Sequence, residues 1–234
     1  MPSAVSYLNV GLYPIPEAGA LLSIPATKLR RWIREYEYTA KGSQYCHHSL
    51  IKRQFGKEKQ ILSFLELMEL HFIKMFRSEG VSMATIRRAA EAAAEMYNTD
   101  YPFAVQRFDT DGRRIFVTLQ REVTGRRKRS IVEDLGRGQQ VFEHIMRPFF
   151  RKLEYRNAQE ISRYWPLERA GGIVLDPARK FGKPIDAGTG VPTRALYDAF
   201  RADERQDERA VAKWFHVPLR AVRAAIRFEK SLLS

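Results

Sequence analysis

The 234-residue chain is poor in cysteine and contains no long apolar run. Its single cysteine, Cys46, has no second thiol in the chain with which to form a disulfide, which is typical of proteins in a reducing compartment. No apolar run reaches the roughly 18 residues that a membrane span requires. The first residues lack the basic and apolar segments of a secretory signal. We therefore expect a cytoplasmic protein that does not associate with a membrane.

The chain also lacks the compact motifs of nucleotide-binding sites. The segment DPARKFGKPIDAGTGVPTRALYDAF, residues 176–200, has glycines that suggest a phosphate-binding loop. Gly182 and Gly188 are one residue too far apart for that loop, however, and Thr189 stands where its lysine belongs. We therefore predict a turn before a helix, which Thr193 would cap.

No set of residues has the spacing of a metal site or a catalytic group. Cys46, His47 and His48 are adjacent, and adjacent side chains diverge too far to bind one ion without a second ligand pair. The sequence contains neither a G-x-S-x-G nor an H-E-x-x-H motif. We expect no catalytic residue, no metal and no cofactor, and hence a protein that is not an enzyme.

What the chain has in excess is positive charge. It has 40 Lys and Arg residues against 27 Asp and Glu residues, a formal net charge of +13. Such an excess indicates an anionic partner, most often nucleic acid. An arginine-rich protein that binds no polyanion would have the same net charge. The positions of the basic residues must therefore distinguish a nucleic-acid-binding protein from such a protein.

Residues 15–36 have the pattern of two short helices joined by a turn at Ser23–Ile24, with Pro16 and Pro25 near the helix starts. The apolar stripe of the second helix is formed by Leu29, Trp32, Ile33 and Tyr36. A helix-turn-helix motif places its second helix in the major groove of DNA, whereas an ordinary helical hairpin is the alternative. The residues predicted to contact DNA are Thr27, Lys28, Arg30, Arg31 and Arg34.

The middle of the chain is predicted to supply structure and dimerisation. Residues 37–60 are polar and fit a loop or a wing. Ser63 and Ser82 are predicted to cap helices, and Asp111-Gly112 between alternating residues predicts a β-hairpin. A further helix is expected from about Val132 to Leu153. The apolar faces of these helices are expected to form a homodimer, because helix-turn-helix proteins usually read two half-sites with two-fold symmetry.

The last part of the chain has a second helix-turn-helix pattern. Residues 166–172 are rich in turn-forming residues, so we divide the chain into domains at 1–160 and 171–234. A short strand is expected near Val174, and a turn at His216-Val217 precedes the last helix. The basic face of that helix is formed by Arg220, Arg223, Arg227 and Lys230, and is expected to bind either DNA or a protein partner. The predicted fold class is mainly α with a small β-hairpin, in two domains that each contain a helix-turn-helix.

Two stretches of the N-terminal half resemble the DNA-reading domain of the MerR family. Residues 15–36, with Ile24-Pro25-Ala26-Thr27, Leu29-Arg30 and Trp32, are similar to its helix-turn-helix. GVSMATIRRA, residues 80–89, is similar to the helix that follows the wing in that family.

The C-terminal half resembles the small helix-turn-helix domain of VapB-type antitoxins. The family pattern is Gly-x-Pro, then Gly-Thr-Arg, then a hydrophobic residue and Pro. Gly182-x-Pro184, Gly188-Thr189 and Val191-Pro192 match it, whereas Gly190 replaces the arginine. Together the two resemblances cover most of the chain, in the arrangement of the longer, two-domain VapB-like antitoxins.

What these resemblances imply is a type II toxin–antitoxin role. Such antitoxins bind a PIN-type ribonuclease toxin, block its metal-dependent RNA cleavage and repress their own operon by binding double-stranded operator DNA. An arginine-rich surface suits a site of clustered carboxylates, because arginine pairs with carboxylates through parallel hydrogen bonds. One alternative is a MerR-like transcription regulator with a ligand-sensing second domain and no toxin partner. A nuclease is a third alternative and would need a divalent-metal site.

Overall fold

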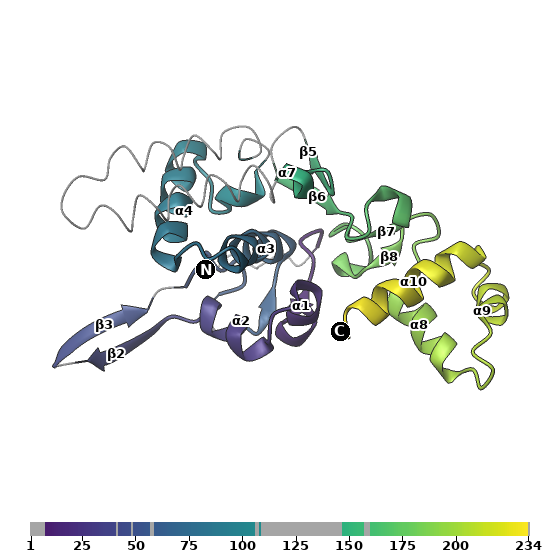
Figure 1. Ribbon diagram of the computed structural model, residues 1–234. Coiled ribbons are helices and arrows are strands. Elements are labelled where there is room, and N and C mark those ends of the chain that lie inside the picture. The colour runs from purple at the N-terminus through teal and green to yellow at the C-terminus, as the bar shows by residue number, and fades with distance from the viewer. Residues whose placement is uncertain are drawn as a thin grey trace.

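The computed structural model describes residues 8–40, 42–47, 49–56, 59–105, 108, 147–156 and 160–233. This part of the chain is mainly α, as predicted, with small antiparallel strand pairs (Figure 1). The helices are α1 (Ile15–Leu22), α2 (Ala26–Ile33), α3 (Phe64–Ser78), α4 (Met83–Tyr97), α7 (Arg147–Phe150), α8 (Thr193–Ala202), α9 (Glu208–Trp214) and α10 (Leu219–Ser231), with 3-10 turns η1 (Pro102–Ala104), η3 (Arg169–Gly171) and η4 (Lys180–Gly182).

The strands pair two by two. The pairs are β1 (Tyr13–Pro14) with β4 (Ile61–Leu62), β2 (Tyr36–Ala40) with β3 (Ser43–His47), β5 (Leu153–Arg156) with β6 (Glu160–Tyr164), and β7 (Ile173–Val174) with β8 (Ile185–Asp186). The strand expected near Val174 is therefore present as β7. The hairpin expected at Asp111-Gly112 lies outside the described residues, as does most of the helix expected from Val132.

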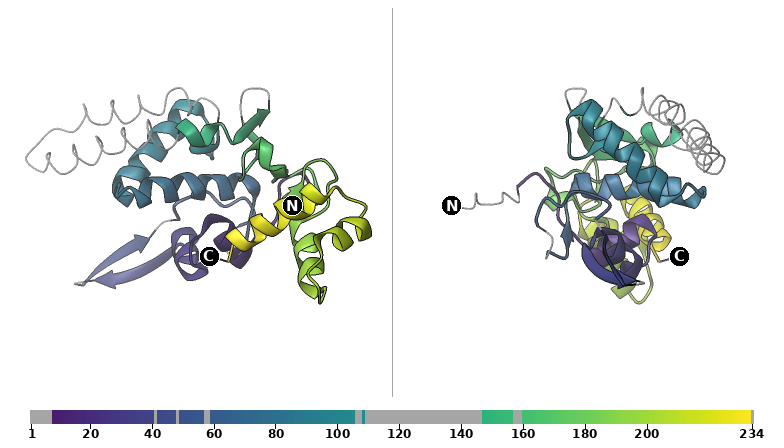
Figure 2. Two further views of the ribbon diagram at one scale, coloured as in Figure 1. Left: turned by 45° about the vertical axis from the view of Figure 1, so that its right-hand side comes forward. Right: turned by 90° about the vertical axis from the view of Figure 1, so that its left-hand side faces the viewer.

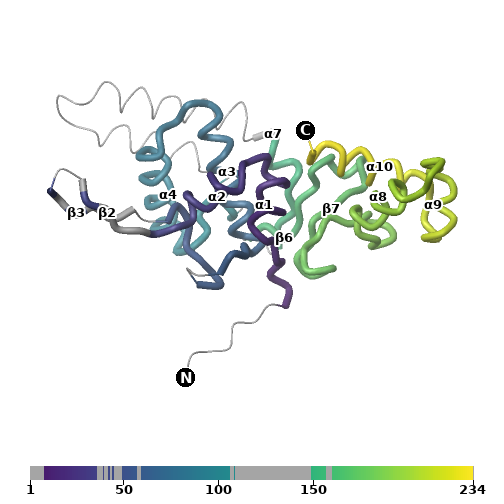
Figure 3. Tube along the Cα trace, turned by 90° about the horizontal axis from the view of Figure 1, so that it is seen from below, coloured from purple at the N-terminus to yellow at the C-terminus, as the bar shows by residue number. Residues whose placement is uncertain are grey.

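The described elements form two units that lie side by side (Figures 1 and 2). The first unit contains α1 to α4, and the second contains α8, α9 and α10 together with β7 and β8. The β5–β6 pair lies between the two. The β2–β3 hairpin projects from the end of the first unit that lies farthest from α9, which the view from below in Figure 3 also shows.

The caps predicted for α3 and α4 are confirmed. The Ser63 hydroxyl accepts the backbone N–H of Glu66, and the Glu66 carboxylate accepts the backbone N–H of Ser63, which is a complete capping box. The Ser82 hydroxyl accepts the backbone N–H of Thr85 at 3.1 Å. These side chains fix where both helices begin because they satisfy amide groups that have no partner within the helix.

The prediction that a helix continues to Leu153 is wrong. α7 ends at Phe150, and Leu153 pairs with Tyr164 as the first residue of β5. The side chains of Phe149, Phe150 and Leu153 are all buried, and their spacing is compatible with a helical stripe. The chain turns between them instead, and the backbone N–H of Lys152 donates to the carbonyl of Phe149. Burial of the same apolar side chains is thus achieved by a turn and a strand.

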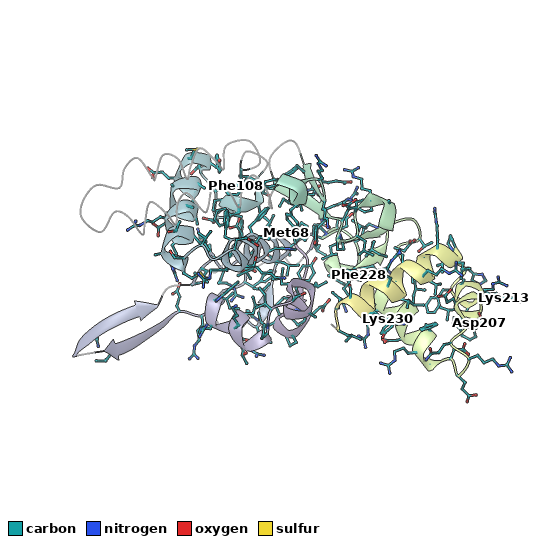
Figure 4. The ribbon with its side chains drawn as sticks, viewed as in Figure 1. Met68, Phe108, Asp207, Lys213, Phe228 and Lys230 are labelled. Carbon is teal, nitrogen blue, oxygen red and sulfur yellow. The ribbon has the colours of Figure 1, made fainter. Side chains whose placement is uncertain are left out.

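The first unit has an aromatic core centred on α3. The ring of Phe72 lies with its centroid between 5.4 and 6.4 Å from the ring centroids of Phe103, Phe108, Phe149 and Phe150. Figure 4 shows Phe108 and Met68 within this unit. Ring pairs at such separations add to the free energy gained by burying the rings, so α3 is the element on which the rest of the unit packs.

A second core lies within α8, α9 and α10, and a small third cluster joins the two units. The third cluster consists of Ile173, Ala224 and Phe228, against which Leu21 of α1 and Leu232 pack. Leu21 also contacts the first core. The C-terminal end of α10 is therefore packed directly against the back of α1.

Candidate nucleic-acid interface

α1 and α2 form a tight hairpin whose turn is fixed by its backbone. Ser23 adopts a left-handed conformation with φ 49°, and the N–H of Ile24 donates to the carbonyl of Gly19 at 2.8 Å. A Cβ atom on Gly19 would lie only 2.7 Å from the carbonyl oxygen of Ile24. The glycine is required because the turn passes closer to α1 than any side chain allows.

α2 is strongly amphipathic. Leu29, Trp32 and Ile33 are buried, as the apolar stripe predicted. Tyr36 was expected to extend that stripe, but α2 ends at Ile33 and Tyr36 begins β2. The residues expected to contact DNA are all exposed, and four of them lie on α2 while the last follows directly as its C-cap: Thr27, Lys28, Arg30, Arg31 and Arg34.

The basic residues of α2 differ in how firmly they are held. The ammonium of Lys28 lies 5.3 Å from the ring centroid of Trp32, and Nε of Arg30 donates to the side-chain oxygen of Gln60 at 3.3 Å. The side chain of Arg31 forms no hydrogen bond or ion pair with any other residue that the structure describes. Its guanidinium is consequently available to a phosphate without breaking an internal contact.

The β2–β3 hairpin follows α2 directly and lies in the region that was predicted to be a loop or a wing. Its register pairs Tyr36 with His47 and Ala40 with Ser43. Beyond β3, the backbone N–H of Leu50 donates to the carbonyl of Trp32 at 2.9 Å. This bond holds the returning chain against the end of α2, so the helix and the hairpin project from a common base.

A buried ion pair fastens that base to α3. Nε of Arg53 lies 2.9 Å from Oε1 of Glu66, and both side chains are almost fully enclosed. The same carboxylate accepts the backbone N–H of Gln54 and forms the capping box with Ser63. The Glu66 carboxylate thus accepts a backbone N–H at the start of α3 and also orients the segment that follows β3. Its burial is tolerated because each of its two oxygens accepts at least one hydrogen bond.

The second basic face lies on α10. Arg220, Arg223, Arg227 and Lys230 are all exposed, while the opposite side of the helix packs on α8 and α9. Nε of Arg223 is 2.7 Å from a carboxylate oxygen of Glu208 on α9, so this arginine is already paired. Figure 4 shows Lys230 at the end of α10 that approaches the first unit and Lys213 at the far end of the molecule.

The segment before α8, residues 176–192, forms turns around the short strand β8, which agrees with the prediction of a turn before a helix. Oδ2 of Asp186 accepts hydrogen bonds from both the backbone N–H and the hydroxyl of Thr189, each at 2.8 Å. Gly190 has φ 74°, and a Cβ there would lie 2.8 Å from Nη2 of Arg179. The turn therefore favours glycine at 190, because the backbone is left-handed and an arginine side chain from 179 lies against it.

Thr193 does not cap α8, contrary to the prediction. It is the first residue of the helix, and no side chain caps this end. Its hydroxyl donates instead to Oε1 of Glu229 on α10 and also lies 3.3 Å from the carbonyl of Pro184. Pro192 holds the cap position, so the Thr193 hydroxyl does not accept a capping bond and donates instead to a buried glutamate on a distant helix, a contact of which sequence spacing contains no signal.

Sequence reasoning also missed a cavity between the two units. It lies where α1, the start of α8 and the end of α10 meet, and its lining includes Glu17, Lys183 and Glu229. These residues come from three distant parts of the chain. Within the described ranges, no group of His, Cys, Asp and Glu side chains is arranged to hold a metal ion. The same ranges contain no helix long and apolar enough to span a bilayer.

Comparison with known proteins relates the whole arrangement to mycobacterial proteins. No protein-family model matches the chain. The sequence is 25% identical over 203 residues to a Mycobacterium tuberculosis protein named "Putative antitoxin VapB45", and the match covers 83% of this chain and 84% of that protein. The crystal structure of Rv2018 from Mycobacterium tuberculosis superposes with a TM-score of 0.67 at 22% identity, covering 94% of this chain and 99% of that one. The chain thus shares its fold with Rv2018 and most of its length with a protein that bears an antitoxin name.

Proposed function

We propose that this protein is a VapB-type antitoxin that acts in the cytoplasm, binds its own operator DNA and inhibits a PIN-type ribonuclease toxin without catalysing a reaction itself. The observation that carries the DNA-binding part is the exposed face of α2, where Thr27, Lys28, Arg30 and Arg31 project beside the β2–β3 hairpin. The toxin-binding part rests on the similarity to the protein named as an antitoxin.

On this proposal α2 enters the major groove and the hairpin follows the adjacent backbone. The first turn of α2 carries Thr27 and Lys28, which suit contacts to base edges, and Arg31 and Arg34 suit phosphates. The protein acts as a homodimer, since two such helices related by two-fold symmetry read two half-sites. The alternative of a MerR-like regulator with no toxin partner shares this face, so only a toxin assay separates the two.

The division of labour between the two basic faces is tested with paired variants. Arg31→Ala should weaken binding to the DNA upstream of the protein's own gene and lower the slope of log affinity against log salt by about one unit, because one phosphate contact is lost. It should leave toxin inhibition unchanged. Arg201→Ala, which removes an exposed arginine of α8, is the matched control and should change neither property.

The α10 face is tested with a triple variant, Arg220→Ala, Arg227→Ala and Lys230→Ala, that spares the internally paired Arg223. If this face binds the toxin, RNA cleavage should reappear in a complex co-expressed with the product of the neighbouring gene, while DNA affinity changes by no more than a few-fold. Loss of DNA binding with the toxin still inhibited would reverse the assignment of the two faces. Failure of any neighbouring gene product to co-purify would favour the regulator without a toxin.

A further inference from the structure

A cavity at the junction of the two units has the composition of a ligand site. Its volume is about 310 Å³, at the lower end of the range for small-molecule pockets. We call it the seam pocket and define it by Glu17, Leu21, Lys183, Arg194, Glu229 and Leu233. α1, the loop before α8, the first turn of α8 and the last turns of α10 each contribute to its wall, so it exists only when both units are in place.

Glu229 supplies a buried carboxylate with an unused oxygen. The residue is only 6% exposed although it carries an ionisable group. Its Oε1 accepts the hydroxyl of Thr193. Its Oε2 has only Nη1 of Arg194 nearby, at 4.0 Å, which is too long for a hydrogen bond, and Nε of Arg194 is already bonded to Asp198 at 2.9 Å. Among the described residues no donor forms a hydrogen bond with this oxygen. It is not one of the fully enclosed side-chain atoms, so it is accessible to an occupant of the pocket that Glu229 lines.

Glu17 brings a second carboxylate to the same cavity from α1. It is half-buried, and its carboxylate forms no hydrogen bond with another described residue. Burial raises the pKa of its carboxyl, Lys183 opposes this, and the negative charge of Glu229 raises it further. Burial likewise raises the pKa of Glu229. The charge of Glu229 thus disfavours ionisation of Glu17, and a cation in the cavity that both side chains line would oppose this effect.

The remaining walls of the pocket are largely apolar. Leu21, Leu232 and Leu233 line it together with Pro184 and Pro192. Leu233 is 68% exposed, so apolar surface that faces solvent would be covered by an occupant. We propose that the seam pocket binds a small organic cation, a primary amine with a compact apolar body, whose ammonium lies between the carboxylates of Glu17 and Glu229. An anion is disfavoured since it would lie against both carboxylates, although Lys183 and Arg194 would attract it.

The proposal is tested with three probes of one shape. Cyclohexylamine, cyclohexanol and cyclohexanecarboxylate are titrated separately into the full-length protein at neutral pH, and binding is followed by amide chemical shifts. The amine should bind about ten-fold more tightly than the alcohol, because a charged hydrogen bond adds roughly 1.5 kcal/mol. The shifts should map to α1 and to the ends of α8 and α10. Equal binding of amine and alcohol, or tighter binding of the carboxylate, would overturn the proposal.

Two variants and a control locate the site. Glu229→Gln keeps an oxygen for Thr193 and removes the charge, and Glu17→Gln removes the second charge without breaking a described hydrogen bond. Each should weaken amine binding about ten-fold and leave alcohol binding unchanged. Glu208→Gln, at the ion pair with Arg223 on α9, should have no effect. If Glu229→Gln does not fold, the Glu17→Gln variant alone tests the site. Amine binding to Glu17→Gln that is as tight as binding to the wild type would then refute the proposal. These measurements involve neither DNA nor toxin, so they are independent of the proposed function.

Discussion

Glu69 makes the stability of the first unit depend on pH in an unusual direction. This residue of α3 is 2% exposed, and its Oε1 accepts the backbone N–H groups of Phe103 and Ala104 at 2.7 and 2.8 Å. Burial raises the pKa of its carboxyl from 4.5 to about 8, although these two bonds act to lower it. The folded chain therefore holds a proton at neutral pH that the unfolded chain has released.

The sign and size of the effect follow from linkage. Between pH 4.5 and about pH 8 the folded state binds more protons at Glu69 than the unfolded state does, so the free energy of unfolding falls as the pH rises. Each pH unit within this window costs about 1.4 kcal/mol. His71 acts in the opposite sense, but only below pH 6.5. From pH 6.5 to pH 8 the contribution of Glu69 should therefore decline by roughly 2 kcal/mol.

The assay compares urea unfolding of the wild type and Glu69→Gln at pH 6.5, 7.25 and 8. Glutamine keeps an oxygen for the two backbone amides and cannot ionise. The stability of the variant relative to wild type should therefore rise with pH by roughly 2 kcal/mol across this range, as one buried ionisation is removed. Glu91→Gln, at an exposed position on α4, should show no such trend. A difference between Glu69→Gln and wild type that stays constant with pH would refute the reasoning.

Three further variants test individual contacts. Burial lowers the pKa of His71 to about 3, so protonation of this residue favours the unfolded state below pH 6.5 and offsets the effect of Glu69 down to pH 4.5. The stability of His71→Leu relative to wild type should therefore rise by roughly 1.4 kcal/mol per pH unit as the pH falls from 6.5 to 4.5, measured by urea unfolding. Gly19→Ala should destabilise the chain by roughly 1 to 3 kcal/mol in thermal unfolding, because the new methyl group meets the carbonyl of Ile24; unchanged stability would mean that the turn yields easily. Tyr13→Phe should cost roughly 1 to 3 kcal/mol by urea unfolding, because it leaves the carbonyl of Gly182 without its buried donor.

Much of the local structure could be predicted from the sequence because its determinants are local. The caps at Ser63 and Ser82 lie within three residues of the amides they satisfy. The two faces of α2 follow from helical spacing, and the exposure of Arg31 follows with them. Such features depend on a few neighbouring residues, which a single sequence displays directly.

What the sequence did not reveal depends on contacts between distant segments. The hydroxyl of Thr193 bonds to Glu229, which no spacing rule connects to it. The apolar residues around Leu153 fit a helix as well as a turn followed by a strand, and the pairing with Tyr164 decides between them. The seam pocket was invisible for the same reason, since Glu17 and Glu229 lie near opposite ends of the chain.

The bond from Tyr13 to Gly182 has a consequence for biosynthesis. Its two residues are 169 positions apart, and the backbone N–H of Leu12 also donates to the carbonyl of Phe181. At about 5 to 20 residues per second, a ribosome needs roughly 10 to 30 seconds to extend the chain from one partner to the other. During that interval α1 and α2 are already synthesised while the acceptors for Leu12 and Tyr13 do not yet exist. The nascent protein therefore passes through a stage in which α1 and α2 precede the segment to which Leu12 and Tyr13 donate, and this junction closes among the last steps of folding.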